Sequence, residues 1–385
     1  MYCKRVAVKN FRNIKEAQVD FSPGVNVLVG ENAQGKTNLL EAIFYASVGR
    51  SFRAANIGEM IRFGEKSAEI SLDYQCDERE RSDSLSIKLF TDKKKTVEKN
   101  HLKVERMSDI VGSFRAVLFC PEHLSLIKEG PSERRNYLDI AISRISPKYI
   151  RSLQRYAYFL KQRNALIKVA YGNRAAFDAT VDLWSEKMAE EAAIISEMRY
   201  LFTARVSRLV NAHFEKMTGS REKVDMVYKG CAGLDGDEYL NRDKVKAKYM
   251  ELLSSSHDRE ISAGATLYGI HKDDADIKLN GKSARTYASQ GQQRSLALAM
   301  KLAEGEICRE EFGDYPVFLF DDVLSELDET RRDYMILSAT DKQVIISTCE
   351  GRFVEKMKAD KRIFVSEGTY RQFDNNESLY FNESS

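Results

Sequence analysis

Alternating and continuous apolar positions near the N-terminus predict a series of strands. Polar and apolar residues alternate over 4–9 and again over 17–21, as in strands with one buried face. A mostly apolar run over 25–29 is typical of a buried strand, and apolar positions with helical spacing follow over 39–46. Further strands are expected over 67–104 and 116–120. The N-terminal part is therefore predicted to mix strands and helices.

The pattern changes after Gly130-Pro131, beyond which strand signals disappear for almost ninety residues. Two long stretches with helical periodicity, 146–171 and 174–217, are separated only by Gly172-Asn173. Two long helices with a short joint predict an antiparallel hairpin. A further helix is expected over 243–255.

Strand signals return in the last third of the chain. The expected strands cover 266–269, 275–279, 317–320 and 344–347. Asn280-Gly281 is a preferred two-residue hairpin turn, and a long helical pattern covers 292–311. This return of strands indicates that a second part of the N-terminal fold lies here.

A chain of 385 residues is long enough for two lobes. We expect residues 1–125 and 263–372 to form one discontinuous head, and residues 126–262 to form a helical insertion lobe. Residues 373–385 are polar and are expected to fray. The predicted fold class is α/β, with mixed sheets and helices, interrupted by a mostly helical second lobe.

Composition changes this picture little. Hydrophobic residues make up 43% and charged residues 31%, and the net charge is only +2. The six cysteines are scattered without a CxxC pair, which favours reduced thiols in a cytoplasmic protein over a zinc site. The N-terminus has no apolar signal region, and no run is long enough to cross a bilayer, so we expect no membrane association.

The strongest chemical signal is a phosphate-binding loop between the strand at 25–29 and the following helix. The pattern GxxxxGK[ST] is matched by Gly30, Glu31, Asn32, Ala33, Gln34, Gly35, Lys36 and Thr37. Glycines let successive N–H groups approach phosphate oxygens, and the helix N-terminus favours negative charge. Lys36 is expected to reach the β- and γ-phosphates and Thr37 to bind Mg²⁺, so ATP and Mg²⁺ are the predicted cofactors.

A second signal is the apolar strand 317–320, which ends in Asp321-Asp322. Beside a phosphate loop, Asp321 is expected to hold the Mg²⁺ shell and Asp322 to polarise the attacking water. The alternative is two solvated carboxylates at a strand end, which is a common pattern. The presence of the phosphate loop favours the functional interpretation over this alternative.

A third signal is Ser289-Gln290-Gly291-Gln292-Gln293, which leads directly into a helix. Ser289, Gly291 and the helix N-terminus together predict a second phosphate-facing surface. Its spacing ahead of Asp321 is about that of the ABC signature, and Ser325-Glu326-Leu327-Asp328 follows the acidic pair. The alternative for SQGQQ is an ordinary helix cap.

The order of these motifs resembles the ABC/SMC class of ATPase heads. Further stretches make the chain similar to the RecF family of bacterial DNA replication and repair proteins. They are KNFRN at the N-terminus, Gly49-Arg50-Ser51-Phe52-Arg53, Cys120-Pro121-Glu122, Gly130 to Arg135, and Gly269 to Asp274. The resemblance covers most of the chain and implies a P-loop head split by a helical lobe.

The resemblance also implies a function. Members of the family dimerise on ATP, hydrolyse it slowly and bind double-stranded and gapped DNA, especially single-strand/double-strand junctions. They work with RecR and RecO to help load RecA at gaps. Here it implies a homodimer and a weak DNA-dependent ATPase that acts as a timer.

By resemblance, Ser289 and Gly291 reach the γ-phosphate bound to the partner subunit, and Arg12, Asn13 and Arg53 touch the nucleotide. Three positions depart from the class. They are Glu122 in place of a metal-sensing glutamine, Thr348 in place of histidine, and Asp322 in place of glutamate. A hydroxyl at Thr348 and the shorter side chain of Asp322 predict weak turnover.

A candidate DNA surface lies between Ile140 and Phe177, where the sequence has no acidic residue. Its basic residues are Arg144, Lys148, Arg151, Arg155, Lys161, Arg163, Lys168 and Arg174, interleaved with Tyr149, Tyr156, Tyr158 and Tyr171. Such charge predicts phosphate contact without base reading. The alternative is pairing with the acidic stretch 178–197. Lys93 to Lys95 and Lys99 to Arg106 form a second candidate surface.

Two other functional classes remain open at this point. The chain has the phosphate loop, signature and acidic strand of a membrane-transporter ATPase subunit, but its helical insertion and its Asp321-Asp322 pair argue against that class. It also fits a structural clamp that binds ATP without useful hydrolysis.

Overall fold

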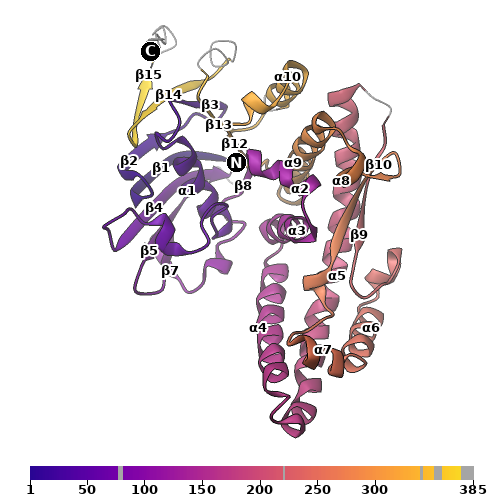
Figure 1. Ribbon diagram of the computed structural model, residues 1–385. Helices are drawn as coiled ribbons and strands as arrows, with labels where there is room; N and C mark the ends of the chain where they lie inside the picture. The colour runs from indigo at the N-terminus through magenta and orange to yellow at the C-terminus, as the bar shows by residue number, and fades with distance from the viewer. Residues whose placement is uncertain (77–80, 220–221, 339–340, 351–357, 374–385) are drawn as a thin grey trace. The chain divides into compact units, whose positions relative to one another are not determined.

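The computed structural model describes residues 1–76, 81–219, 222–338, 341–350 and 358–373 (Figure 1). It divides into two compact units, which we call the head unit and the helical unit. The head unit comprises Met1–Leu124, Ala212–Arg221 and Gln290–Ser385, and the helical unit comprises Ser125–Asn211 and Glu222–Ser289. Residues 263–289, which the sequence analysis assigns to the head, group with the helical unit, so the functional division of the chain stays a prediction. The predicted frayed tail, apart from Phe373, lies outside the described residues.

The first sheet of the head unit is antiparallel, in the order β2-β1-β4-β5-β6-β7. Its strands are β1 (Tyr2–Phe11), β2 (Ile14–Asp20), β4 (Ser67–Cys76), β5 (Arg81–Phe90), β6 (Thr96–Lys99) and β7 (Leu102–Val104). Buried and partly exposed residues alternate along β4, because one face of the sheet packs inward. The meander predicted over 67–104 is therefore confirmed.

The second sheet has the order β15-β14-β3-β13-β12-β8. Its strands are β3 (Val25–Val29), β8 (Ala116–Phe119), β12 (Val317–Asp321), β13 (Val344–Thr348), β14 (Lys361–Ser366) and β15 (Thr369–Phe373). All neighbours are parallel except β14 and β15, which form an antiparallel hairpin. The carboxyl ends of parallel strands meet at one edge, so the residues that follow β3, β12 and β13 are brought together.

Helices complete the head unit. They are α1 (Lys36–Val48), α9 (Gln290–Phe312) and α10 (Glu329–Leu337), with short 3₁₀ turns η1 (Ile57–Met60), η3 (Met107–Asp109), η4 (Pro121–Leu124) and η7 (Leu324–Glu326). Helix α1 contacts strands of both sheets, which explains why ten of its residues are buried. Helix α9 contacts β8, and all of its residues from Leu296 to Met300 are buried, so this part of the helix is covered on every side.

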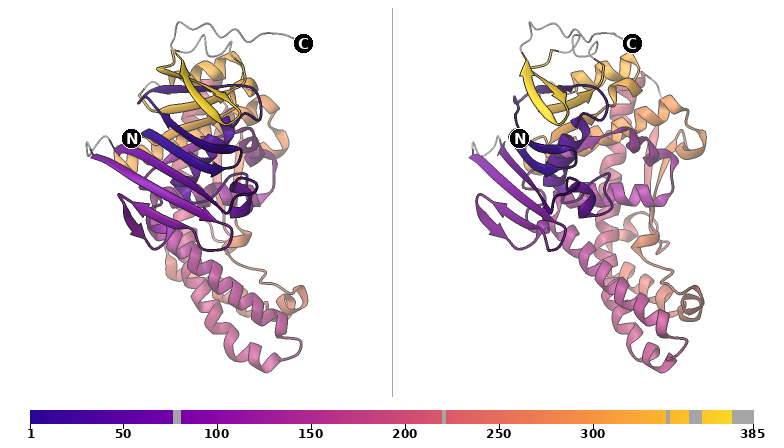
Figure 2. Two further views of the ribbon diagram at one scale, coloured as in Figure 1. Left: turned by 90° about the vertical axis from the view of Figure 1, so that its left-hand side faces the viewer. Right: turned by 60° about the vertical axis from the view of Figure 1, so that its left-hand side comes forward.

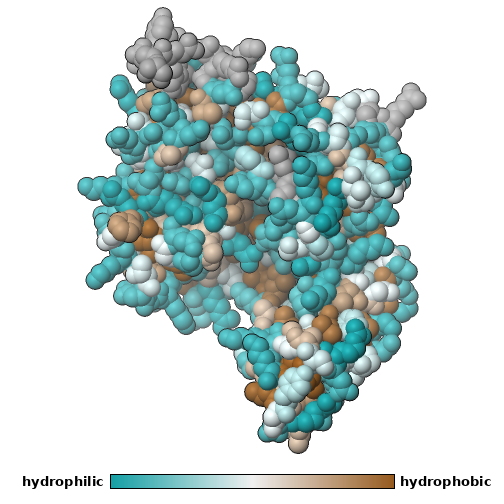
Figure 3. Space-filling view, viewed as in Figure 1, coloured by the Kyte–Doolittle hydropathy of each residue, from teal (hydrophilic) through white to brown (hydrophobic). Residues whose placement is uncertain are grey.

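The helical unit is built around a helix hairpin. Its helices are α2 (Ser125–Lys128), α3 (Pro131–Ile145), α4 (Pro147–Val169), α5 (Arg174–Thr218), α6 (Arg242–Ser254), α7 (His257–Ala263) and α8 (Ala284–Tyr287), with the turn η5 (Gly236–Leu240). The last residues of α5, from Ala212 onward, belong to the head unit. Figure 2 shows α4 running beside the first part of α5, as the sequence predicts. Figure 3 shows hydrophobic side chains at the surface near the end of this hairpin. No helix of the described residues is long and apolar enough to cross a membrane.

A three-stranded antiparallel sheet, β11-β10-β9, completes this unit. Its strands are β9 (Val224–Lys229), β10 (Asp274–Leu279) and β11 (Lys282–Ser283). The hairpin turn at Asn280-Gly281 is confirmed, with φ of 51° and 76°. The strand predicted over 266–269 is wrong. Side chains satisfy its backbone in place of a neighbouring strand: Thr266 N–H donates to Asn164 Oδ1 (2.9 Å), and Leu267 N–H donates to Glu260 Oε1 (2.9 Å).

The GIHKDD motif builds a buried polar core in the helical unit. Asp273 is fully buried and accepts hydrogen bonds from Arg199 Nη1 (2.9 Å) and the Cys231 N–H (2.8 Å). His271 Nδ1 lies 2.7 Å from the hydroxyl of Tyr156. Gly269 closes the turn (η6, Ile270–Lys272), where a Cβ atom would lie 2.1 Å from the same hydroxyl. The motif is thus explained by packing within this unit.

Candidate nucleotide-binding site

The phosphate loop lies between β3 and α1 at the carboxyl edge of the second sheet. Ala33 and Gly35 have positive φ angles of 64° and 118°, which bend the loop ahead of α1. A Cβ atom on Gly30 would lie 2.2 Å from the carbonyl oxygen of Val365, so only glycine fits there. The backbone is therefore shaped as the sequence motif predicts.

The Lys36 side chain folds back over this loop and is only 5% exposed. Its Nζ donates to the carbonyl oxygens of Gly30 and Glu31, the latter at 2.6 Å. Burial lowers the pKa of Lys36, while the nearby carboxylates of Asp321 and Asp322 oppose that change. The ammonium group is thus held inside the loop, where an anion bound by the backbone N–H groups would meet it.

Three hydroxyl and carboxyl groups from three different elements meet beside the loop. Thr37 Oγ1 donates to Asp321 Oδ1 at 2.8 Å, and Ser347 Oγ donates to the same oxygen at 2.6 Å. Asp321 is 5% exposed; burial raises the pKa of its carboxyl group, and the two hydrogen bonds lower it. The structure therefore brings together Thr37 and Asp321, which the sequence predicts as metal ligands. Hydroxyl and carboxylate oxygens are the kind of ligands that Mg²⁺ prefers.

Asp322 lies at a sharp turn directly after β12, with a φ of 51°. Its N–H group donates to Ser347, to the carbonyl oxygen at 3.2 Å and to Oγ at 3.0 Å. The thiol of Cys349 lies 3.8 Å from Asp322 Oδ1. Ser347 thus contacts both aspartates, a role that the sequence analysis missed because the residue looks like ordinary strand sequence.

Two of the departures from the class pattern also lie near Asp321. Thr348 is buried, and its Oγ1 accepts a hydrogen bond from the Glu350 N–H at 3.1 Å. Glu122 is exposed on η4, and its charge contributes to the raised pKa of Asp321. A role for Thr348 or Glu122 in the reaction stays a prediction.

The β14–β15 hairpin covers the other side of the loop. Tyr370 Oη donates to the Gly35 carbonyl oxygen at 2.9 Å. The Gly368 N–H donates to the Gln34 carbonyl oxygen at 2.8 Å, and the Glu367 N–H donates to Gln34 Oε1 at 2.6 Å. This hairpin was not predicted from the sequence, although the apolar run Ile363-Phe364-Val365 was an available signal.

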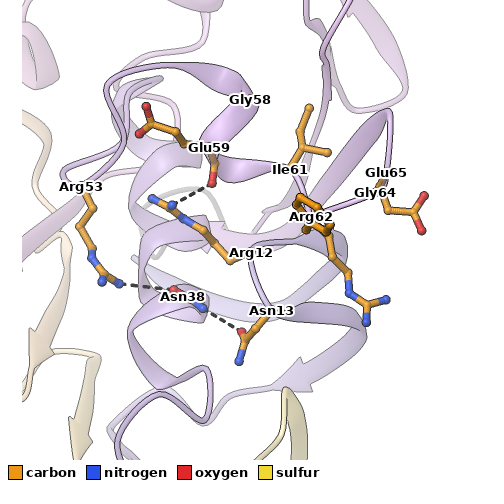
Figure 4. Close-up of a pocket in the computed structure, with 11 residues that line it drawn as sticks. Arg12, Asn13, Asn38, Arg53, Gly58, Glu59, Ile61, Arg62, Gly64 and Glu65 are labelled. Carbon is orange, nitrogen blue, oxygen red and sulfur yellow. Dashed lines mark hydrogen bonds between the residues drawn. The ribbon is translucent and has the colours of Figure 1, made fainter.

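An open pocket of about 610 Å³ lies beside the loop, lined by the three residues predicted to touch the nucleotide and by Asn38 (Figure 4). Arg12 donates to the buried Glu41 through Nε (2.9 Å) and Nη2 (2.8 Å). Arg53 reaches Asn38 Oδ1 at 3.4 Å, and Asn38 donates to Asn13 Oδ1 at 2.8 Å. The pocket brings Arg12, Asn13 and Arg53 together, and their contact with a nucleotide stays a prediction.

The SQGQQ segment begins α9 two residues earlier than predicted, at Gln290, so Gly291 lies in the first helical turn. Ser289 is the last residue of the helical unit, and Gly291 belongs to the head unit. Their predicted contact with the nucleotide of a second copy is a question about two chains and stays a prediction.

The predicted basic surface is only partly available to a ligand. Arg163 is fully buried and pairs with the buried Glu260 at 2.6 Å. Arg144 is 1% exposed, and Tyr149 and Tyr156 are also buried. The basic side chains that remain exposed on α4 are Lys148, Arg151, Arg155, Lys161 and Lys168. Among these, Arg155 makes an ion pair with Glu191 at 3.1 Å.

The acidic-stretch alternative therefore explains part of this surface. Arg174 pairs with Asp178 at 2.9 Å, but it also pairs with Asp258 on α7. In the second candidate surface, Lys95 donates to the hydroxyl of Tyr45 at 2.9 Å and Lys99 donates to Ser113 Oγ at 2.9 Å. The ammonium groups of these two lysines are therefore engaged in hydrogen bonds within the head unit.

Comparison with known proteins gives matches over almost the whole chain. The model of the RecF/RecN/SMC N terminal domain family matches residues 2–372. The DNA replication and repair protein RecF of Ruminiclostridium cellulolyticum is 36% identical and covers 94% of this chain and 97% of its own. RecF of Bacillus cereus (strain B4264) is also 36% identical, over 96% and 98%.

Solved structures agree. The recombination mediator protein RecF-ATPrS of the RecFOR pathway has a TM-score of 0.90 at 33% identity, over 97% of this chain and 98% of that chain. An Smc head bound to a domain of ScpA has a TM-score of 0.56 at 18% identity, which shows a shared fold. The fold is that of an ABC/SMC-type ATPase head, and the matches give no support to a transporter subunit. The chain belongs to the RecF family of DNA replication and repair proteins.

Proposed function

We propose that this chain binds ATP and Mg²⁺ at the phosphate loop, forms a homodimer on ATP binding, and retains that dimer on gapped DNA. The observation that carries the proposal is the convergence of Lys36, Thr37 and Asp321 at one edge of the second sheet. The lysine, hydroxyl and carboxylate come from the two segments that hold them in P-loop ATPases. A relative that is 33% identical has been solved as RecF-ATP.

Each residue of the site has a role in this proposal. The loop from Gly30 to Thr37 binds the phosphates, and Lys36 neutralises charge on the β- and γ-phosphates. Thr37 and Asp321 hold Mg²⁺, which stabilises negative charge on the phosphate oxygens when bound. Asp322 polarises the attacking water, although its short side chain and the buried Thr348 favour slow turnover.

In the dimer, Ser289 and Gly291 of one copy face the γ-phosphate held by the other. ATP then acts as the link between subunits, and hydrolysis acts as a timer for release. This arrangement makes the protein a weak DNA-dependent ATPase. Single-turnover kinetics separates it from a clamp without useful hydrolysis, because a clamp would release no phosphate during the lifetime of the dimer.

For DNA, the exposed basic residues of α4 are the contact surface we favour, since they span most of a 23-residue helix. Phosphate contacts by such residues are independent of sequence and sensitive to salt. The preferred substrate is a single-strand/double-strand junction at a gap. There, as in the family, the protein would work with RecR and RecO to help load RecA. A cytoplasmic location is part of this proposal.

Size determination with and without ATP, and with and without gapped duplex, tests the dimer. We expect a shift from monomer to dimer only with ATP, and retention on gapped DNA only in that state. Lys36→Met should abolish both, because it removes the ammonium group from the loop. The exposed Lys15→Met on β2 is the matched control. Dimerisation of Lys36→Met at wild-type ATP concentrations would reject the proposal.

Charge reversal tests the DNA surface. Arg151→Glu with Arg155→Glu should weaken DNA binding and reduce its salt dependence, since each lost phosphate contact lowers the salt slope by about one. Lys9→Glu with Lys15→Glu makes the same change in net charge on the first sheet and serves as the control. Equal DNA affinity and salt slope in the two double variants would reject the α4 surface.

A further inference from the structure

A network of side chains joins the first turns of α9 to the loop that follows the acidic pair. Both segments belong to the head unit. Arg331 on α10 donates through Nε to Ser295 Oγ at 2.6 Å and through Nη1 to the carboxylate of Asp328. Ser295 Oγ in turn donates to the carbonyl oxygen of Gly291 at 3.1 Å. One guanidinium group therefore contacts both segments.

The same arginine packs against the glycine in SQGQQ. A Cβ atom at Gly291 would lie 3.2 Å from Arg331 Nη2, so a methyl group there would require the guanidinium to shift by a few tenths of an ångström. Gly291 has no positive φ angle that would otherwise require glycine. Arg331 thus packs closely on the first turn of α9.

A second contact joins the same two segments. Arg294 Nη2 donates to Glu326 Oε2 at 2.7 Å, but the two side chains are 37% and 38% exposed. An exposed ion pair of this kind contributes little. Arg331 is 18% exposed, and its planar fork contacts a hydroxyl and a carboxylate at once, so its geometry is the more restrictive of the two.

We propose that Arg331 is a positioning residue that fastens residues 325–328 to the first turn of α9, so that both meet a second copy of this chain as one preformed surface. The inference rests on the proposed function, which places Gly291 against the nucleotide of the partner. A surface that is ordered before association loses less conformational freedom on binding. Arg331 therefore strengthens dimerisation through these segments and does not contact the nucleotide bound by its own chain.

Arg331→Ala tests the inference through two separate measurements. ATP affinity of the monomer, measured below the dimerisation concentration, should stay within about twofold of wild type. The dissociation constant of the ATP-bound dimer, measured by sedimentation, should rise by about tenfold or more. Arg309→Ala removes another arginine, 51% exposed on α9, and should leave both values unchanged.

Two further variants separate positioning from charge. Arg331→Lys keeps the charge but cannot contact Ser295 and Asp328 with one planar group, so it should recover only part of the dimer affinity. Ser295→Ala should weaken the dimer in the same direction and by less. Full recovery in Arg331→Lys would show that charge alone is sufficient and would reject the role of the fork.

The remaining outcomes are distinguishable. If the wild-type chain does not dimerise with ATP, the proposed function fails and this inference fails with it. If wild type dimerises and Arg331→Ala dimerises equally well, only this inference is rejected. A fall in monomer ATP affinity equal to the loss of dimer affinity would also reject it, because a general disturbance of the head unit would explain both.

Discussion

Replacement of Ser347 by alanine is the most direct test of how the acidic pair is held. Ser347 is fully buried, donates to Asp321 Oδ1 at 2.6 Å and accepts from the Asp322 N–H at 3.0 Å. The Asp322 N–H keeps its second acceptor, the Ser347 carbonyl oxygen at 3.2 Å, in the variant. The variant therefore mainly removes the hydrogen bond to the Asp321 carboxylate.

The magnitude follows from the charge on the acceptor. A hydrogen bond to a charged group contributes about 1.5–3 kcal/mol. Residues that orient metal ligands typically change metal affinity by about 10–100-fold when removed. We expect Ser347→Ala to weaken the apparent Mg²⁺ affinity of the ATP complex by about that factor. The hydrogen bond from Ser347 also lowers the pKa of Asp321, so its loss should raise that pKa and increase the Mg²⁺ requirement at acidic pH.

The assay is a Mg²⁺ titration of ATP binding and of single-turnover hydrolysis at two pH values. Ser185→Ala is the matched control, because Ser185 is equally buried but lies on α5 of the helical unit. ATP binding without Mg²⁺ should be the same in all three proteins. A Mg²⁺ dependence of Ser347→Ala within twofold of wild type would refute the idea that Ser347 orients a metal ligand.

Three further predictions concern stability. Gly30→Ala places a Cβ atom 2.2 Å from the Val365 carbonyl oxygen and should lower the free energy of unfolding by about 1–3 kcal/mol in urea; an unchanged midpoint would contradict the crowding. Arg163→Met leaves Glu260 buried without its partner and should cost about 3–5 kcal/mol, and adding Glu260→Gln should recover part of it, a coupling that independent sites would lack. Burial lowers the pKa of His271 to about 4, so the unfolded chain binds a proton first and stability should fall from about pH 6.5 towards 4. His271→Gln should flatten that slope in denaturation series, and a slope as steep as wild type would show that other groups cause it.

Local sequence was sufficient where the structure depends on local geometry. The phosphate loop was predicted in full, because its glycines and its strand–loop–helix context act over eight neighbouring residues. The hairpin of α4 and α5 was also predicted, since helical periodicity over more than twenty residues leaves little ambiguity. The proximity of Thr37 and Asp321 could be inferred because both follow or end buried parallel strands.

Other features depended on contacts between residues far apart in the chain. The strand expected over 266–269 is absent, and the Thr266 N–H group is satisfied by Asn164, which lies 102 residues away in the chain. Two of the eight basic residues of the predicted surface, Arg144 and Arg163, are buried inside the helical unit, because burial and pairing depend on which helices meet.

The same limit applies to Ser347 and Arg331. By sequence alone, Ser347 is one polar residue at the end of an apolar strand and Arg331 is one of many charged helical residues. Only the parallel pairing of β12 with β13 brings Ser347 beside both aspartates. Only the packing of α10 near the first turn of α9 places the Arg331 guanidinium against Gly291. Periodicity and motifs thus determined most of the elements and the backbone of the phosphate loop. The side chains that join separate elements were decided by tertiary packing, because their partners are set by three-dimensional proximity and not by spacing along the chain.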